Sequence, residues 1–293
     1  MSTASDRHTV SDRNAAPGEG PVAEPLAGFA VGVTAARRHE ELAALLERRG
    51  ARVVLAPAVR LAPLAGDAGL LAATRAFAAG SRAADPTPLR RLVGQAVAGT
   101  VDAITFTSAP AVAETLAVAA ADGLDEPLLD ALRDRVVAAC VGPVTARVLT
   151  ARGVPTVQPE RARLGALVRA LVTGLPARRS RWLSVRGCAL ELRGHAVVLD
   201  GLLRPIAPAP MAVLQALARR PGHVVSRAEL CGVLPSRFAA AGEARPRADE
   251  HAVEMAVARL RRGLGRPGIV ETVVKRGYRL ACDPRLTAGP STG

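Results

Sequence analysis

The sequence predicts an α/β domain with a parallel sheet, followed by a smaller domain of short strands, helices and a basic hairpin. Strand and helix patterns alternate between residues 29 and 172, which is typical of a parallel sheet covered by helices. The last hundred residues instead combine an arginine-rich amphipathic helix with two short strands around Lys275-Arg276-Gly277. A chain of 293 residues is long enough to build two hydrophobic cores.

The α/β domain begins with the apolar run Phe29–Thr34, which predicts a buried strand. Leucines at 42, 45 and 46 then predict an amphipathic helix over His39–Arg49 that ends at Gly50. The other expected strands are Arg52–Ala56, Ala103–Thr107, Val136–Val141 and Val154–Val157. The other expected helices are Leu70–Ala79, Leu89–Ala98, Pro110–Ala121, Val144–Arg152 and Leu164–Val172.

Composition predicts the domain limits and excludes several classes of protein. We expect a disordered leader at 1–27, the α/β domain at 28–175, a linker at 176–182, the second domain at 183–283 and a disordered tail at 284–293. Four cysteines lie far apart and five histidines lack metal-ligand spacing, so neither a metal nor a cofactor is expected. Because the sequence shows no signal-peptide pattern and no apolar run long enough for a membrane span, we expect a cytoplasmic protein that does not enter a membrane.

The net charge of +13 points to an acidic partner. Residues 181–283 contain 17 basic and 9 acidic residues, so this domain alone has a net charge of +8. Such an excess suits nucleic acid, although a generally basic composition explains it equally well. Only one of the 39 basic residues of the chain is lysine, Lys275.

Short hydroxyls and glycine follow the predicted parallel strands. Because the carboxyl ends of these strands meet at one edge, backbone N–H groups and hydroxyls there can bind the carboxylates of an anionic ligand. The alternative is that these residues only cap helices. The candidates are Thr34, Thr107, Ser108, Gly142 and Thr145.

The arginine-rich helix lies in the second domain. Val253, Val257, Leu260 and Leu264 form one apolar stripe, and Asp249 is a candidate N-cap. A polar, basic face opposite that stripe suits the major groove of DNA, although a solvated arginine face explains it as well. The two strands that follow are Ile269–Val274 and Tyr278–Leu280.

Several spaced segments of this domain resemble the C-terminal winged-helix domain of OmpR/PhoB-type transcription regulators. They are the short strands of Gly187–Gly201, a first helix at Pro208–Arg219, a capping box of Ser226 and Glu229, and the final ETVVKRGYRL. The resemblance implies double-stranded DNA as a partner and RNA polymerase contacts through the loop at 231–248. The DNA-binding residues it implies are Arg227, His251, Glu254, Met255, Arg259, Arg261, Arg262, Thr272, Lys275 and Arg276.

Three segments of the first domain resemble uroporphyrinogen-III synthases. They are VGVTAAR, which ends at Arg37, DAITFTSAPAV from Asp102 and VGPVTA from Val141. The resemblance implies a flavodoxin-like lobe, adds Arg37 to the candidate ligand residues and suggests an anionic tetrapyrrole or another small ligand. Full synthases have two such lobes and this chain has one set of segments, so one lobe is missing.

Three functions follow from the combination of domains. The first is a DNA-binding transcription regulator whose degenerate synthase lobe senses a ligand or self-associates. The second is a bifunctional synthase that converts hydroxymethylbilane to uroporphyrinogen III, with catalytic residues that the sequence does not identify. The third makes the α/β domain only a platform for a homodimer. The isomer of uroporphyrinogen that the protein forms separates the second function from the others.

Overall fold

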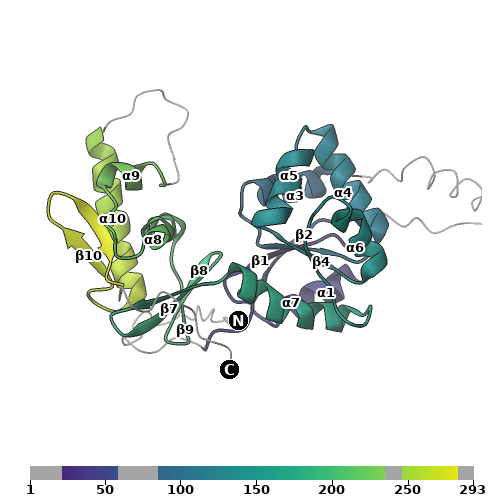
Figure 1. The fold of residues 1–293 in the computed structure, drawn as a ribbon, viewed down its shortest axis with the longest axis horizontal. Helices are drawn as coiled ribbons and strands as arrows, with labels where there is room; N and C mark the ends of the chain where they lie inside the picture. The colour runs from purple at the N-terminus through teal and green to yellow at the C-terminus, as the bar shows by residue number, and fades with distance from the viewer. Residues whose placement is uncertain (1–21, 59–84, 235–245, 283–293) are drawn as a thin grey trace, which may run out of the picture. The chain divides into compact units, whose positions relative to one another are not determined.

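The structure, a computed structural model, describes residues 22–58, 85–234 and 246–282, with side chains from residue 250 onward in the last segment. The chain divides into two compact units. The α/β unit comprises Ala23–Leu183 and Leu190–Val198, and the C-terminal unit comprises Val22, Ser184–Ala189 and the described residues from Leu199 onward. Figure 1 shows the elements of each unit.

A five-stranded parallel sheet forms the centre of the α/β unit. Every neighbouring pair of strands is parallel, and the strand order is β2-β1-β3-β4-β5. This is the order of a flavodoxin-like sheet, as the sequence predicts. The strands are β1 (Ala30–Val33), β2 (Arg52–Leu55), β3 (Ala103–Phe106), β4 (Val137–Cys140) and β5 (Thr156–Val157).

Helices cover both faces of this sheet because successive strand residues point to opposite sides. On β3, Ala103 packs with the leucines of α1 and α7, whereas Ile104 packs with those of α3. In Figure 1, α1 and α7 accordingly lie on the opposite side of the strands from α3, α4 and α5. The helices are α1 (His39–Glu47), α3 (Thr87–Val97), α4 (Ala109–Ala121), α5 (Asp125–Asp134), α6 (Pro143–Thr150) and α7 (Leu164–Arg179).

Helices α5 and α7 differ from the sequence prediction. Helix α5 was not predicted, although two acidic residues open it and its leucines at 128, 129 and 132 are buried. Helix α7 continues through Arg179 because the stripe of Leu167 and Leu171 extends to the fully buried Leu175. The expected linker at 176–182 is therefore helix up to Arg179 and strand from Arg181.

Some predictions concern residues at the limits of the described chain. The described part of the expected leader includes Leu26, whose side chain is buried and whose N–H donates to the carbonyl of Arg49 at 2.7 Å. The expected helix Leu70–Ala79, the tail at 284–293 and most of the loop at 231–248 lie outside the described residues.

The described residues from Arg181 onward fold as a winged helix with a four-stranded sheet, three helices and a hairpin, and Leu190–Val198 of that sheet are part of the α/β unit. The sheet has the order β6-β7-β8-β9, and β10 pairs antiparallel with β11. The strands are β6 (Arg181–Val185), β7 (Cys188–Arg193), β8 (Ala196–Leu199), β9 (Leu202–Arg204), β10 (Val270–Val273) and β11 (Gly277–Leu280). The helices are α8 (Pro208–Arg219), α9 (Arg227–Cys231) and α10 (Pro246–Leu264).

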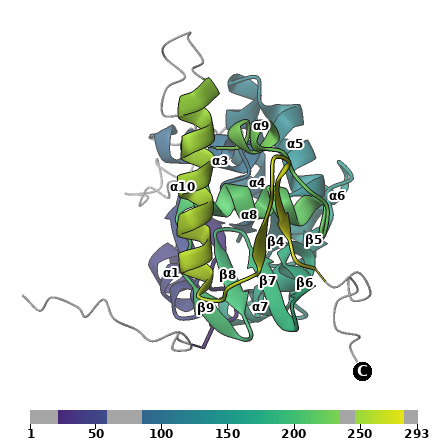
Figure 2. The ribbon, with the colours of Figure 1, turned by 90° about the vertical axis from the view of Figure 1, so that its left-hand side faces the viewer.

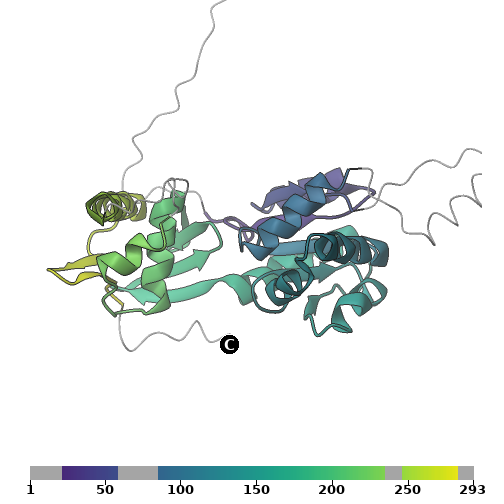
Figure 3. The ribbon, with the colours of Figure 1, turned by 90° about the horizontal axis from the view of Figure 1, so that it is seen from above.

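Helix α10 is anchored by the stripe that the sequence predicts. Val253, Val257, Leu260 and Leu264 are all buried, and α10 packs against α8 and α9. Helix α10 begins at Pro246 rather than after an Asp249 cap, since proline is well accommodated in the first turn of a helix. Figure 2 shows α10 running alongside the β10–β11 hairpin, and Figure 3 shows α10 nearly along its axis.

Candidate functional site

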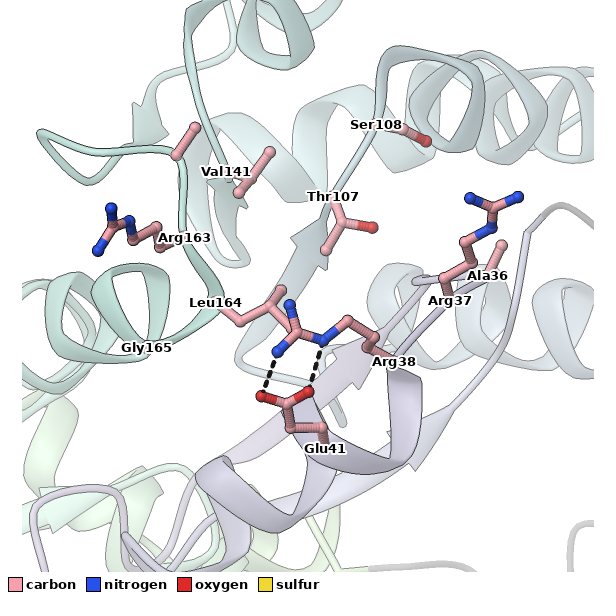
Figure 4. A pocket seen from close by; sticks show the side chains of 11 residues that line it. Ala36, Arg37, Arg38, Glu41, Thr107, Ser108, Val141, Arg163, Leu164 and Gly165 are labelled. Atoms are coloured by element: carbon pink, nitrogen blue, oxygen red, sulfur yellow. Dashed lines mark hydrogen bonds and ion pairs between the residues drawn. The ribbon is translucent and has the colours of Figure 1, made fainter.

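A pocket of about 590 Å³ opens at the carboxyl edge of the parallel sheet. Strand β1 pairs with β2 on one side and β3 on the other, so the strand order reverses between β1 and β3. Such a reversal point is where open α/β sheets bind ligands. Thr107 and Ser108 follow β3, Arg37 follows β1, and Arg163 precedes α7, and all four line the pocket (Figure 4).

Helix N-termini face this pocket. Arg38 is the N-cap of α1, Ser108 the N-cap of α4 and Arg163 the N-cap of α7. The Ser108 hydroxyl accepts a hydrogen bond from the Ala111 N–H at 3.3 Å. The positive ends of three helix dipoles therefore add to the potential of the arginines and favour an anion.

The pocket has a net positive charge. Arg38 donates two hydrogen bonds to the Glu41 carboxylate, at 2.6 and 2.7 Å, and this pair raises the pKa of Arg38 above its ordinary value. Arg37 and Arg163 are exposed, and no ion pair engages either of them within the described residues. Three arginines against one glutamate leave a net charge of +2 around the pocket.

The pocket brings together half of the ligand residues that the sequence predicts. Arg37, Thr107 and Ser108 line it. Thr34 is fully buried and its hydroxyl donates to the Thr105 carbonyl at 2.8 Å, while Thr145 is buried in α6 and Gly142 is the N-cap of that helix. Arg163 and Leu164 were not predicted from the sequence, although their position at the start of a helix that follows a strand is a signal for them.

The second candidate site is the surface formed by α10 and the β10–β11 hairpin. Arg227 is half-buried, and the other DNA-binding residues predicted from the sequence are exposed. Among these exposed residues, Glu254, Arg261 and Thr272 already contact other protein groups. Arg261 donates to the Val270 carbonyl at 3.0 Å and to the Thr272 hydroxyl at 2.8 Å, which ties α10 to β10.

Arg227 lies close to both α10 and the hairpin. Its guanidinium carbon lies 5.9 Å from the centroid of the Tyr278 ring, and Arg261 lies 6.0 Å from the same ring. Arg227 also forms a 3.5 Å ion pair with Glu254 of α10. The pKa of Arg227 is raised above its ordinary value, mainly by the adjacent Tyr278 side chain and further by the Glu254 carboxylate. This cluster holds the hairpin against the helix.

The tip of the hairpin is exposed and basic. Val274, Lys275 and Arg276 connect β10 to β11, and Lys275 adopts a left-handed conformation with φ of 60°. Gly277 has φ of 134°, and a Cβ there would overlap the Val225 carbonyl, which accepts the Tyr278 N–H at 3.0 Å. Glycine is therefore required where the hairpin meets the segment before α9.

A capping box fixes the start of α9, as the sequence predicts. The Ser226 hydroxyl accepts the Glu229 N–H at 3.2 Å, and the Ser226 N–H donates to the Glu229 carboxylate at 2.9 Å. The Ser226 N–H and the guanidinium of Arg220 lower the pKa of Glu229 to about 2. The positions of Arg227 and the hairpin depend on this turn.

The part of the chain that the structure describes contains neither a metal-binding cluster nor a membrane-spanning helix. No group of three or more histidine, cysteine, aspartate or glutamate side chains is arranged to bind a metal ion there. None of the helices in that part is both long and apolar enough to cross a membrane.

Comparison with known proteins finds two families. Residues 79–169 match the family model of uroporphyrinogen-III synthase HemD, and residues 205–280 match that of the C-terminal domain of transcriptional regulatory proteins. A comparison with curated proteins finds no match.

Among solved structures, uroporphyrinogen III synthase from Thermus thermophilus is similar at 18% identity, over 51% of this chain and 98% of that chain, with a TM-score of 0.41. The RstA DNA-binding domain of Klebsiella pneumoniae, solved in complex with the RstA box, is similar at 24% identity over 34% and 96%, with a TM-score of 0.28. Both TM-scores are below 0.5, so the assignment rests on the two family models. The chain therefore joins a uroporphyrinogen-III synthase-type domain to an OmpR/PhoB-type C-terminal domain of transcriptional regulators.

Proposed function

We propose that this protein is a transcription regulator that binds double-stranded DNA through α10 and the β10–β11 hairpin. The observation on which this rests is the exposed face of α10, where no hydrogen bond or ion pair engages Arg259 or Arg262 within the described residues. An α-helix fits the major groove, where arginine binds guanine edges and phosphates. The match of residues 205–280 to transcriptional regulators supports the same function.

The hairpin supplies a second contact in this proposal. Lys275 and Arg276 are exposed at its tip, and the ties from Arg261 to β10 fix the hairpin relative to α10. Basic side chains on a fixed hairpin bind phosphates and set the register of the helix on the duplex. The proposal thus assigns base contacts to α10 and backbone contacts to the hairpin.

The test of DNA binding is selection from a pool of random-sequence duplexes with the full-length protein. We expect one family of related sequences to be enriched, and we expect an Arg259→Ala, Arg262→Ala double variant to lose that enrichment. The matched control replaces Arg90 and Arg91, which are exposed on α3 of the other unit. Equal recovery of all sequences by the wild type would contradict the proposal.

The α/β unit, in this proposal, senses an anionic small molecule in the pocket at its carboxyl edge. Three features of this pocket support binding of carboxylates. Arg37 and Arg163 form no ion pair within the described residues, Thr107 and Ser108 supply hydroxyls, and three helices begin there. An anionic tetrapyrrole belongs to this class of ligand. RNA polymerase is a further partner that the resemblance implies, and a second copy of the chain is the partner if the α/β unit self-associates.

Calorimetric titration with uroporphyrin, an octacarboxylate, and with citrate tests the sensor. We expect binding by the wild type that Arg37→Ala and Arg163→Ala each weaken by about tenfold or more, as loss of a charge-assisted pair does. The control is Arg147→Ala, since Arg147 is exposed on α6 outside the pocket. Equal affinities of all four proteins would contradict this pocket as the binding site.

The match of residues 79–169 to the synthase family favours one alternative, a bifunctional synthase. Its reaction closes hydroxymethylbilane to uroporphyrinogen III and depends on positioning groups around the substrate. Unaided closure gives the type I isomer, so the isomer formed with the purified protein distinguishes the two functions. We expect type I alone; type III above background would establish the enzyme.

A further inference from the structure

Met255 occupies the centre of the exposed face of α10. It precedes Leu264 by nine residues, which at 3.6 residues per turn places it about 180° around the helix from this buried leucine. The side chain of Met255 is 42% exposed, although methionine is among the residues most often buried. The centre of the proposed DNA-binding face is therefore apolar.

Ala258 extends this apolar centre by one helical turn. Residues three apart on a helix are neighbours, and Ala258 is exposed like Met255. His251, Arg259 and Arg262 lie within roughly 60° of Met255 around the helix axis and surround the pair. The same geometry places Glu254 and Arg261 further round, roughly 100° to 120° from Met255.

The outer residues of this face contact other parts of the unit. Glu254 forms an ion pair with Arg227, and Arg261 donates to Val270 and Thr272 of β10. Neither can reach a base without giving up these contacts. The central group of His251, Met255, Ala258, Arg259 and Arg262 has no such contact within the described residues.

The major-groove edge of DNA offers one kind of apolar group, the 5-methyl of thymine. Methionine suits such a contact because its side chain is flexible and polarizable and adapts to an irregular apolar surface. A polar base edge under Met255 would lose water without gaining a hydrogen bond, which costs free energy. The chemistry of this face therefore selects a thymine opposite Met255.

We infer that Met255, together with Ala258, contacts the 5-methyl group of a thymine in the operator, while Arg259 and Arg262 contact the flanking bases or phosphates. The inference rests on the proposed DNA-binding function and adds the specificity of one position to it. Met255 is thus a specificity-determining residue, and its contact requires no hydrogen bond.

The test uses the duplex that the full-length protein selects from the random pool. Each thymine of that duplex is replaced in turn by uracil, which removes only the 5-methyl group. At one or two positions we expect wild-type affinity to fall about fourfold, the effect of one buried methyl-sized group. Met255→Ala should bind the thymine duplex more weakly and should show no difference between thymine and uracil at those positions.

A matched control truncates an exposed apolar side chain elsewhere. Val144 on α6 is 65% exposed in the α/β unit, so Val144→Ala should keep both the wild-type affinity and the thymine preference. Equal affinities of the wild type for thymine and uracil at every position would overturn the inference. A preference for thymine over uracil that persists in Met255→Ala would overturn it as well. If Arg259→Ala still weakens binding in that case, the proposed DNA-binding function stands without this contact. Selection of no duplex would contradict both.

Discussion

The carboxylate of Asp102 at the start of β3 accepts a hydrogen bond from the backbone N–H of Ala30 at the start of β1, at 2.8 Å. Asp102 is only 3% exposed, and a Cβ on Gly194 would overlap its carboxylate. Burial raises the pKa of Asp102, while the Ala30 N–H and the charges of His195, Arg179 and Arg52 act in the opposite direction. One carboxylate thus joins two neighbouring strands and excludes any side chain at Gly194.

Gly194→Ala should destabilise the α/β unit. The added methyl group has to displace a buried carboxylate, and overpacking of this kind costs about 1–3 kcal/mol. Urea unfolding followed by the fluorescence of Trp182, the single tryptophan of the chain, measures the change in this unit.

The matched control for this substitution is Gly94→Ala. Gly94 lies inside α3, and an added Cβ would have no atom within 4 Å apart from its chain neighbours and the backbone of its own helix, so alanine there should leave stability unchanged or raise it. If the two variants unfolded at the same urea concentration, the packing of Gly194 against Asp102 would not constrain the unit.

Asp102→Asn should change how the stability of the α/β unit depends on pH. The pKa of Asp102 in the folded state lies above the unfolded value of 3.8. The contribution of Asp102 to stability is therefore complete below pH 3.8 and is lost as the pH rises through the folded pKa. Relative to Asp102→Asn, the wild type should therefore lose stability as the pH rises from about 4 toward neutrality. Unfolding midpoints of both proteins across that range check the sign, and parallel curves would contradict it.

Sequence periodicity predicted the sheet and one side of the pocket, because these depend on local order along the chain. Thr107 and Ser108 come directly after the buried strand β3, so the parallel topology brings them to this edge, whereas Arg37 was predicted from the resemblance to the synthases. Arg163 and Leu164 reach the same pocket from the segment before α7, and their position depends on the path between β5 and α7. No periodic pattern encodes that path.

Contacts between distant segments were likewise beyond the sequence. Asp102 and Gly194 are 92 positions apart, and only the packed chain shows that they touch. On α10 the periodicity correctly separated buried from exposed residues. It could not show that Arg261 binds β10 while Arg259 does not, since both are exposed arginines of one helix.

Arg261→Ala and Arg259→Ala should therefore have different effects. Loss of Arg261 removes two hydrogen bonds to β10 and the contact with the Tyr278 ring, so the C-terminal unit should lose about 1–3 kcal/mol of stability. Arg259→Ala should leave stability within about 0.5 kcal/mol of wild type, as is usual at exposed positions, and should weaken DNA binding. Thermal unfolding and duplex binding of both variants test these different roles of Arg261 and Arg259. If the two variants lost the same amount of stability, this prediction would be wrong.

Glu229 should make the stability of the C-terminal unit fall in acid. Its folded pKa of about 2 lies below the ordinary 4.5, so its contribution is present above pH 4.5 and is lost as the pH falls toward 2. Glu229→Gln should flatten the loss of stability between pH 4.5 and pH 2. Ser226→Ala, which removes the N-cap of α9, should cost about 1 kcal/mol at neutral pH. Circular dichroism along an acid titration measures the unfolding of the Glu229→Gln and Ser226→Ala variants. If Glu229→Gln unfolded with the same pH dependence as the wild type, this result would contradict the role of the capping box.

The salt dependence of duplex binding tests the central claim most directly. Arg259→Ala or Arg262→Ala should weaken binding by about 1–3 kcal/mol, and Lys275→Ala should reduce the slope of log K against log salt by about 1. Arg91→Ala, on the exposed face of α3, should behave as wild type. Isotherms of all five proteins that superimpose at every salt concentration would contradict DNA binding by α10 and its hairpin.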